Sequence, residues 1–332
     1  MQGGTFEALA ILLMAAMLPP SVAARPAPID TARAKWTVPR TPWGDPDISG
    51  AWPVEHLAHT PRQRSQLIGT RTELTDEEYE HILRLAQRQI DGREQEADAN
   101  ILSMGHWIER GLPLRQTSLI VEPANGRYPE LTEEGERLAA AEKTSWNNDT
   151  FDWMDDFGLF DRCITRGMPS SMLPGSYNSG IAVHQAPGLV AIRLEMIHDT
   201  RLVHLDGRAP PPPEVTSWLG FSIGHWEGDT LVIETTNFTP GASNGPAPNS
   251  AQLKVTERLT PIGPDEVHYE ARVEDPVVLQ EPYKLAFPWR RQADYQQFEY
   301  ACHEGNYAIR DYITATGTRF AEQRARVAQA NK

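Results

Sequence analysis

The stretch of sequence that decides the fold runs from residue 224 to residue 238 and is Gly224-His225-Trp226-Glu227-Gly228-Asp229-Thr230-Leu231-Val232-Ile233-Glu234-Thr235-Thr236-Asn237-Phe238. Within it, Glu227-Gly228-Asp229 is a turn tripeptide between residues of high strand preference, so we predict a tight hairpin with Gly228 at a positive φ. From Thr230 to Thr236 the side chains alternate between two faces, and five of these seven residues are β-branched. The chain therefore contains at least one well-defined hairpin.

Segments of similar character lie on both sides of this hairpin, at the spacing of a meander. The predicted barrel region begins at residues 162–165, and its strands cover residues 181–185, 189–198, 201–205, 221–226, 230–238, 253–260, 266–273, 283–289 and 297–303. Between them no segment has a helical pattern long enough for a parallel crossover. We therefore predict a mainly β fold, an antiparallel β-barrel or a curved sandwich.

An extended arm and two short helices precede the predicted barrel. Thr75 and Glu78 form a capping box at the start of the first helix, whose apolar stripe indicates that it packs and which Gly92 can end. A strand is predicted over residues 115–122 and a second helix over residues 132–143. The predicted division is a signal peptide at 1–24, an arm and helical region at 25–160 packed on the barrel, the barrel at 161–317 and a polar tail, a frayed helix, at 318–332.

Composition and the N-terminus indicate an exported globular protein. The 332 residues carry a formal net charge of −14, which disfavours nucleic acid and anionic membrane surfaces as partners. Residues 8–18 form an apolar run too short to span a bilayer, and the small residues after Pro20 fit a cleavage site near Ala24. The usual positive residues before the apolar run are missing. We expect a periplasmic or extracellular protein after cleavage.

The chain has two cysteines, Cys163 and Cys302, at opposite ends of the predicted barrel. Because an oxidising compartment favours disulfides, we predict that they pair, with two buried thiols as the alternative. Closing so long a loop would stabilise the fold by roughly 4–5 kcal/mol in the chain-entropy model. Neither cysteine has the surroundings of a catalytic nucleophile.

The predicted strand at 189–198 carries candidate catalytic residues. His198 shares a face with the apolar residues of this strand, whereas Arg193 and Glu195 share the other face, so either set could point into a barrel lumen. A surface ion pair between Arg193 and Glu195 is the structural alternative. The Glu195–His198 spacing is typical of metal sites only on a helix, so on a strand we predict no metal there.

Further candidates lie at turns and strand ends. A disulfide at Cys302 would hold the following loop, with His303 and Glu304, rigidly at a barrel mouth. We expect His198 or His303 to be the acid or base, and Glu195 or Glu304 to be its partner. The candidates for substrate binding are Arg166 and Arg193, which would hold an anionic or oxyanion centre, and Tyr177, His225 and Trp226.

Five motifs in order resemble a family of secreted bacterial proteins. They are residues 41–47 (TPWGDPD), 161–167 (DRCITRG), 195–199 (EMIHD), 226–232 (WEGDTLV) and 300–307 (YACHEGNY), and they extend over nearly the whole mature chain. The resemblance implies an exported protein and carries over no activity. The strand pattern is also loosely similar to that of lipocalin-like barrels, which is an analogy of fold alone.

The sequence contains no nucleophile elbow, Walker loop, dinucleotide fingerprint or zinc-binding spacing. We therefore expect a barrel that binds a small, largely apolar or aromatic molecule and transforms it by acid/base chemistry without metal or cofactor, as a lyase, isomerase or hydrolase. One alternative is a lipocalin-type binding or carrier protein without catalysis, which needs a deep apolar cavity. Another is an envelope interaction protein, which needs an exposed apolar patch.

Overall fold

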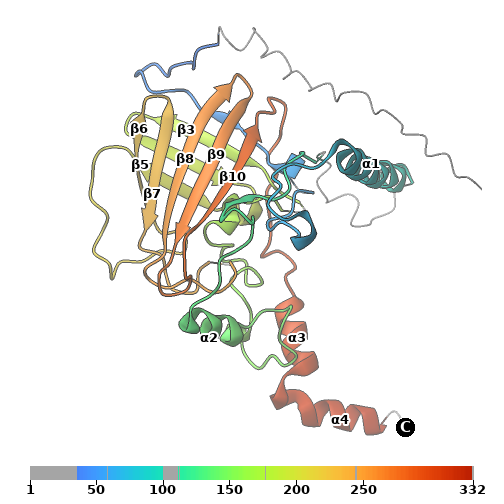
Figure 1. The fold of residues 1–332 in the computed structure, drawn as a ribbon. Helices are drawn as coiled ribbons and strands as arrows, with labels where there is room; N and C mark the ends of the chain where they lie inside the picture. Colours follow the sequence, from blue (N-terminus) through green and yellow to red (C-terminus); the bar gives the residue numbers. More distant parts are fainter. Residues whose placement is uncertain are drawn as a thin grey trace, which may run out of the picture. The chain divides into compact units, whose positions relative to one another are not determined.

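The computed structural model describes residues 36–57, 59–99, 111, 113–175, 177–243 and 245–330 (Figure 1). Its internal contacts divide the chain into residues 1–36 and 37–332, and the fold described below belongs to the second unit. The predicted signal peptide and its cleavage site near Ala24 lie outside the described residues.

Ten strands of the described chain form one sheet in the order β1-β3-β4-β5-β6-β7-β8-β9-β10-β2, and this sheet curls strongly (Figure 1). The strands are β1 (Gly50–Ala51), β2 (Ile120–Glu122), β3 (Ile181–Ala186), β4 (Leu189–Leu194), β5 (Thr200–His204), β6 (Phe221–Glu227), β7 (Thr230–Thr236), β8 (Lys254–Gly263), β9 (Glu266–Glu274) and β10 (Tyr283–Arg290). The prediction of a mainly β, barrel-like fold is confirmed.

The sheet is a half-barrel rather than a closed one. Strands β1 and β2 stand at the two ends of the strand order, and the pairings of the described residues do not join them. The pairing is antiparallel throughout except between β5 and β6, where Val203 faces Ser222 in parallel. The expectation of a purely antiparallel sheet is wrong here because the Pro-rich segment 205–220 carries the chain back to its starting end.

The hairpin that predicted the fold has the expected geometry. Gly228 has φ 61°, and β6 and β7 pair antiparallel from Phe221 to Thr236. Leu231, Ile233 and Thr235 turn to the concave side of the sheet and are fully buried. Leu231 and Ile233 belong to a core that contains Trp52 of the N-terminal arm and large residues of β9 and β10, so the curled sheet encloses packed side chains.

A charged network lies within this core. Arg201 of β5 and Glu257 of β8 form an ion pair with side-chain exposures of 1% and 0%. Arg201 Nη1 and Nη2 donate to the two Glu257 oxygens at 2.9 and 2.5 Å, and the Tyr269 hydroxyl of β9 donates to Oε1 at 2.8 Å. Ser222 of β6 and Thr235 of β7 accept further hydrogen bonds from Nη2. The network therefore connects five neighbouring strands.

The helices differ from the prediction in extent. They are α1 (Asp76–Asp98), α2 (Glu133–Ala141), α3 (Ala308–Thr316) and α4 (Ala321–Ala330). The Thr75–Glu78 capping box is present, with Glu78 N donating to Thr75 Oγ1 at 3.3 Å and Thr75 N to a Glu78 oxygen at 2.8 Å. However, α1 continues past Gly92, because good helix formers follow it and one glycine costs only about 1 kcal/mol.

At the edges of the fold, two predicted strands are wrong in whole or in part and one helix was missed. The strand expected at 115–122 is reduced to β2, and residues 297–303 form loop and turn instead of a strand. Helix α3 was not predicted, although Ile309 and Ile313 have helical spacing and Ile313 is buried. The tail contains α4, as the prediction of a C-terminal helix requires.

Candidate functional site

The candidate site begins where β4 ends. The predicted strand 189–198 is wrong beyond Leu194, because Glu195 adopts a right-handed helical conformation and Ile197 and His198 have φ 60° and 45°. The chain therefore turns sharply, and Glu195 points inward with 2% exposure while His198 remains exposed. Glu195 is consequently not the strand neighbour of Arg193, which is exposed on β4.

Two side chains fix the Glu195 carboxylate. Asn178 Nδ2 donates to Oε1 at 2.6 Å, and the Tyr295 hydroxyl donates to Oε2 at 2.7 Å. Gly180 leaves the room for this arrangement, since a Cβ at that position would overlap both Glu195 Oε2 and the Tyr295 ring. The carboxylate is therefore held in one orientation within the protein.

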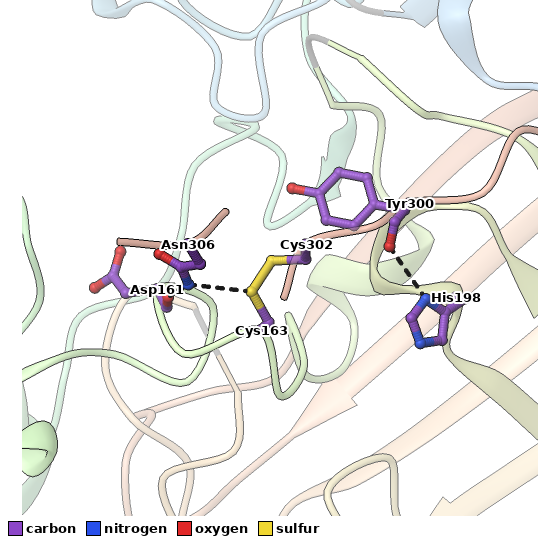
Figure 2. Close-up of a disulfide and its surroundings, with 6 residues drawn as sticks. All are labelled: Asp161, Cys163, His198, Tyr300, Cys302 and Asn306. Carbon is purple, nitrogen blue, oxygen red and sulfur yellow. Dashed lines mark hydrogen bonds between the residues drawn. A yellow bond between two sulfur atoms is a disulfide. The ribbon is translucent and has the colours of Figure 1, made fainter. Parts of the chain in front are cut away.

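The predicted disulfide is present, and it ties two loops together beside this turn. Cys163 and Cys302 are 139 residues apart in sequence, with their Cα atoms 5.8 Å apart. Asn306 Nδ2 donates to the Cys163 Sγ atom at 3.4 Å and to the Asp161 carbonyl at 3.1 Å (Figure 2). The bridge thus fixes the segment before Arg166 against the loop after β10.

Tyr300, just before Cys302, lies between His198 and a pocket. Its carbonyl oxygen is 3.2 Å from His198 Nδ1, so Nδ1 is the donor of that hydrogen bond, and Figure 2 shows the Tyr300 ring pointing away from His198. The ring lies parallel to Tyr177 with 6.3 Å between centroids. Burial, followed by hydrogen bonding and charge from Tyr177, raises the pKa of Tyr300, which remains a neutral phenol.

The pocket has a volume of about 400 Å³ and combines two guanidinium groups with apolar and aromatic walls. Its lining residues are Leu57, Thr60, Arg62, Trp146, Phe160, Arg166, Pro174, Gly175, Tyr177 and Met196. None of these described residues is acidic. A pocket of this size in which several polar groups converge beside aromatic side chains is within the range of small-molecule sites.

The charge of Arg166 is not neutralised by the protein. Within the described part of the chain, neither Arg166 nor Arg62 forms an ion pair with a carboxylate, and the Arg166 contact to the Leu173 carbonyl is long, at 3.4 Å. Burial, followed by the charge of Arg62, lowers the pKa of Arg166 to about 10, while Tyr177 and Tyr300 act in the opposite direction. Arg166 remains a cation at neutral pH, at a cost in solvation.

Thr60 adds an unsatisfied polar atom to the same pocket. Its Oγ1 atom is buried and has no hydrogen-bond partner in the structure, and the residue is 6% exposed. Buried hydroxyls are normally hydrogen-bonded, so such an atom in a pocket wall indicates a missing partner. The pocket thus offers one hydroxyl and two guanidinium groups as donors.

The structure brings together some of the predicted site residues and separates others. Arg166 and Tyr177 line the pocket, Glu195 lies at its inner end and His198 contacts Tyr300 from outside. The remaining candidates lie elsewhere: His303 and Glu304 are exposed in the turn after Cys302, Arg193 is exposed on β4, His225 is exposed beside Glu227, and Trp226 packs against the core.

Sequence reasoning missed the residues that complete the pocket. Thr60, Arg62, Trp146 and Phe160 come from irregular segments, and the first two lie about a hundred residues before Arg166 in the sequence. No periodic pattern marks them, because they are not in strands or helices. The acidic and aromatic stretch 146–161 was the one available signal, and its aromatic residues rather than its acids contribute to the site.

Among the residues that the structure describes, no group of three His, Cys, Asp or Glu side chains is placed to hold a metal ion. Within that same part of the chain, no helix is both long and apolar enough to cross a bilayer.

Comparison of the chain with models of protein families, with curated proteins and with solved structures finds no match.

Proposed function

We propose that the pocket around Arg166 binds a small organic anion with an apolar or aromatic body. The single observation that supports this most strongly is the partly buried Arg166 guanidinium without a carboxylate partner. A charge withdrawn from water and left unpaired costs free energy, and a bound anion would offset that cost. Carboxylates and phosphates fit a guanidinium through paired hydrogen bonds, so the ligand carries one of these groups.

The walls define the rest of the ligand. Trp146, Phe160 and Met196 are apolar or aromatic, and Tyr177 contributes a ring near the two guanidinium groups. Burying an aromatic ring against such walls contributes about 25 cal/mol for each Å² removed from water. A ligand with an anionic head and an apolar or aromatic body therefore satisfies both parts of the pocket.

Acid/base transformation of the bound molecule is the second candidate function, and the carrier without catalysis is its alternative. The observation that favours catalysis is the buried Glu195 carboxylate, which lines the inner end of the site together with Arg166. The reaction would be a lyase, isomerase or hydrolase reaction without a cofactor. Formation of a product from a bound ligand, lost in Glu195→Gln with binding retained, distinguishes the enzyme from the carrier.

The same proposal includes an exported location. The Cys163–Cys302 disulfide agrees with an oxidising compartment, such as the periplasm or the extracellular space. Binding of small organic anions in that compartment is the role we propose. Detection of the protein with its disulfide intact in periplasmic or extracellular fractions tests the location.

The binding proposal is tested with a panel of aromatic and aliphatic carboxylates and inorganic phosphate, using calorimetry and thermal unfolding. We expect at least one carboxylate to bind, and Arg166→Gln to weaken it by roughly 10- to 100-fold, because a charge-assisted hydrogen bond contributes about 1.5–3 kcal/mol. Arg193→Gln tests the other arginine that the sequence suggests. Binding that Arg166→Gln leaves unchanged, or that Arg193→Gln weakens instead, contradicts the proposal.

A further inference from the structure

A second, much smaller cavity adjoins the anion pocket. It has a volume of about 10 Å³, roughly the room that one water molecule or one hydroxyl group needs. Arg166 and Met196 line both cavities, so the anion-binding guanidinium stands at the boundary between them. The small cavity, which we call the inner chamber, therefore continues the pocket beyond Arg166.

Both hydrogen-bond donors and hydrogen-bond acceptors line the inner chamber. Arg166 supplies donors, and the Glu195 carboxylate, which already accepts from Asn178 and Tyr295, has acceptor sites remaining. Ser171 also lines the chamber; it is 8% exposed, and its Oγ atom is buried without any hydrogen-bond partner. A buried hydroxyl left unsatisfied costs about 1–3 kcal/mol unless another group enters and bonds to it.

We propose that the inner chamber is a subsite for a hydroxyl group of the ligand, and that the ligand class is the hydroxy acids. This inference depends on the proposed anion binding at Arg166. A hydroxyl both donates and accepts, so it can donate to Glu195 and accept from Arg166 or Ser171 Oγ in one small space. A water molecule would make the same bonds in the ligand-free protein and would be displaced on binding.

The position of Arg166 sets the distance between the two ligand groups. Because one guanidinium borders both cavities, the carboxylate and the hydroxyl must lie close together, as on adjacent carbons of a 2-hydroxy acid. The apolar or aromatic body then extends into the larger pocket, towards Phe160 and Trp146. A carbon bearing these three different groups is a stereocentre, so the site should prefer one enantiomer.

Phenylacetate and the two enantiomers of mandelate test this inference, because they differ only in the hydroxyl group and its configuration. We expect one mandelate enantiomer to bind wild-type protein about tenfold more tightly than phenylacetate, as a well-formed hydrogen bond to a charged group allows. Ser171→Ala should reduce that preference to about threefold. Ser171→Val, whose methyl groups fill the chamber, should abolish the preference.

The outcomes separate this inference from the function on which it depends. Equal affinities for phenylacetate and both mandelates, with all three weakened by Arg166→Gln, overturn the hydroxyl subsite and leave the anion pocket standing. A crystal structure in which a water remains in the chamber beside bound mandelate also overturns the subsite. If wild-type protein binds none of the three, or if Arg166→Gln has no effect on them, both proposals fail.

Discussion

Arg201 is fully buried and Arg166 partly buried in two different regions of the protein, and the surroundings of these two charges differ. In the centre of the sheet, Glu257 neutralises Arg201, and Ser222 and Thr235 accept further hydrogen bonds from its Nη2 atom, while its Nε atom has no partner among the described residues. In the loop region beside the disulfide, Arg166 faces a pocket, with Arg62 as another cation and no carboxylate partner in the described chain. Of these two arginines, only Arg166 lacks a counter-charge in the described chain.

The pKa values express the same difference. Burial works to lower the pKa of Arg201, but the charge and hydrogen bonds of Glu257 outweigh it and the pKa is raised. For Arg166 burial and the charge of Arg62 prevail, and the pKa falls to about 10. A satisfied buried charge serves the fold, whereas an unsatisfied one at a pocket is a candidate for ligand binding.

The largest effect is expected in the sheet, where Glu257→Gln leaves Arg201 buried without its counter-charge. Removing one partner of a buried ion pair costs about 3–5 kcal/mol, and here Tyr269 also loses its charged acceptor. Urea unfolding followed by circular dichroism measures the loss. A decrease below about 1 kcal/mol would show that the network does not stabilise the sheet.

The double variant Arg201→Met with Glu257→Leu is the matched control for that change. It removes both charges together and replaces them with apolar side chains of similar size, which is often nearly neutral for stability. We expect its free energy of unfolding to lie well above that of Glu257→Gln. If the double variant is the less stable of the two, the cost comes from packing rather than from the unpaired charge.

The two regions also differ in how far the sequence predicts them. Strands β6 to β9 follow from alternating apolar residues and from turn residues such as Gly228, because a half-buried strand imposes a period of two on its side chains. The disulfide was predicted because the chain has only two cysteines and its N-terminal sequence predicts export. These features can be predicted from the residue types and spacings of a single sequence.

The pocket follows no such rule. Thr60 and Arg62 reach it from one irregular segment and Trp146 from another, and only the folded chain places them around Arg166. The end of β4 was mispredicted for a related reason. The apolar alternation continues through Met196, but the chain turns at Ile197, which has a positive φ. Isoleucine rarely adopts a positive φ, so the sequence did not predict the turn. Tertiary contacts stabilise that conformation, and the alternation of apolar residues along the strand does not predict those contacts.

His56 is a third buried basic residue, and its expected effect on the free energy of unfolding is intermediate in size. Burial, with a smaller contribution from Arg290, lowers its pKa from 6.5 to about 4, and its Nε2 atom donates to the Pro288 carbonyl. The folded protein thus keeps His56 neutral, while the unfolded chain takes up a proton below pH 6.5. Stability should therefore fall by about 3 kcal/mol between pH 6.5 and pH 4 through this residue, and then level off.

Comparison with His56→Gln isolates that contribution, since glutamine can still donate to the Pro288 carbonyl but cannot be protonated. We expect the free energy of unfolding of the wild type to fall more steeply with decreasing pH than that of the variant, with the difference confined to pH 6.5–4. Parallel profiles for the two proteins over this range would mean that His56 is protonated equally in both states. In that case the fold tolerates an unpaired cation at a position with no pocket.

The smallest change in stability is expected for Arg166→Met. Making the same substitution at Arg201 turns it into the most direct test of the comparison. Arg166→Met keeps the side-chain volume and removes a charge that the protein does not neutralise, so we expect the free energy of unfolding to rise by about 0.5–1 kcal/mol. Arg201→Met leaves Glu257 buried without its partner and should lower it by several kcal/mol. Chemical denaturation of the two variants beside the wild type measures both signs. A loss of stability in Arg166→Met as large as that in Arg201→Met would mean that Arg166 serves the fold, and the argument for a ligand there would lose its main support.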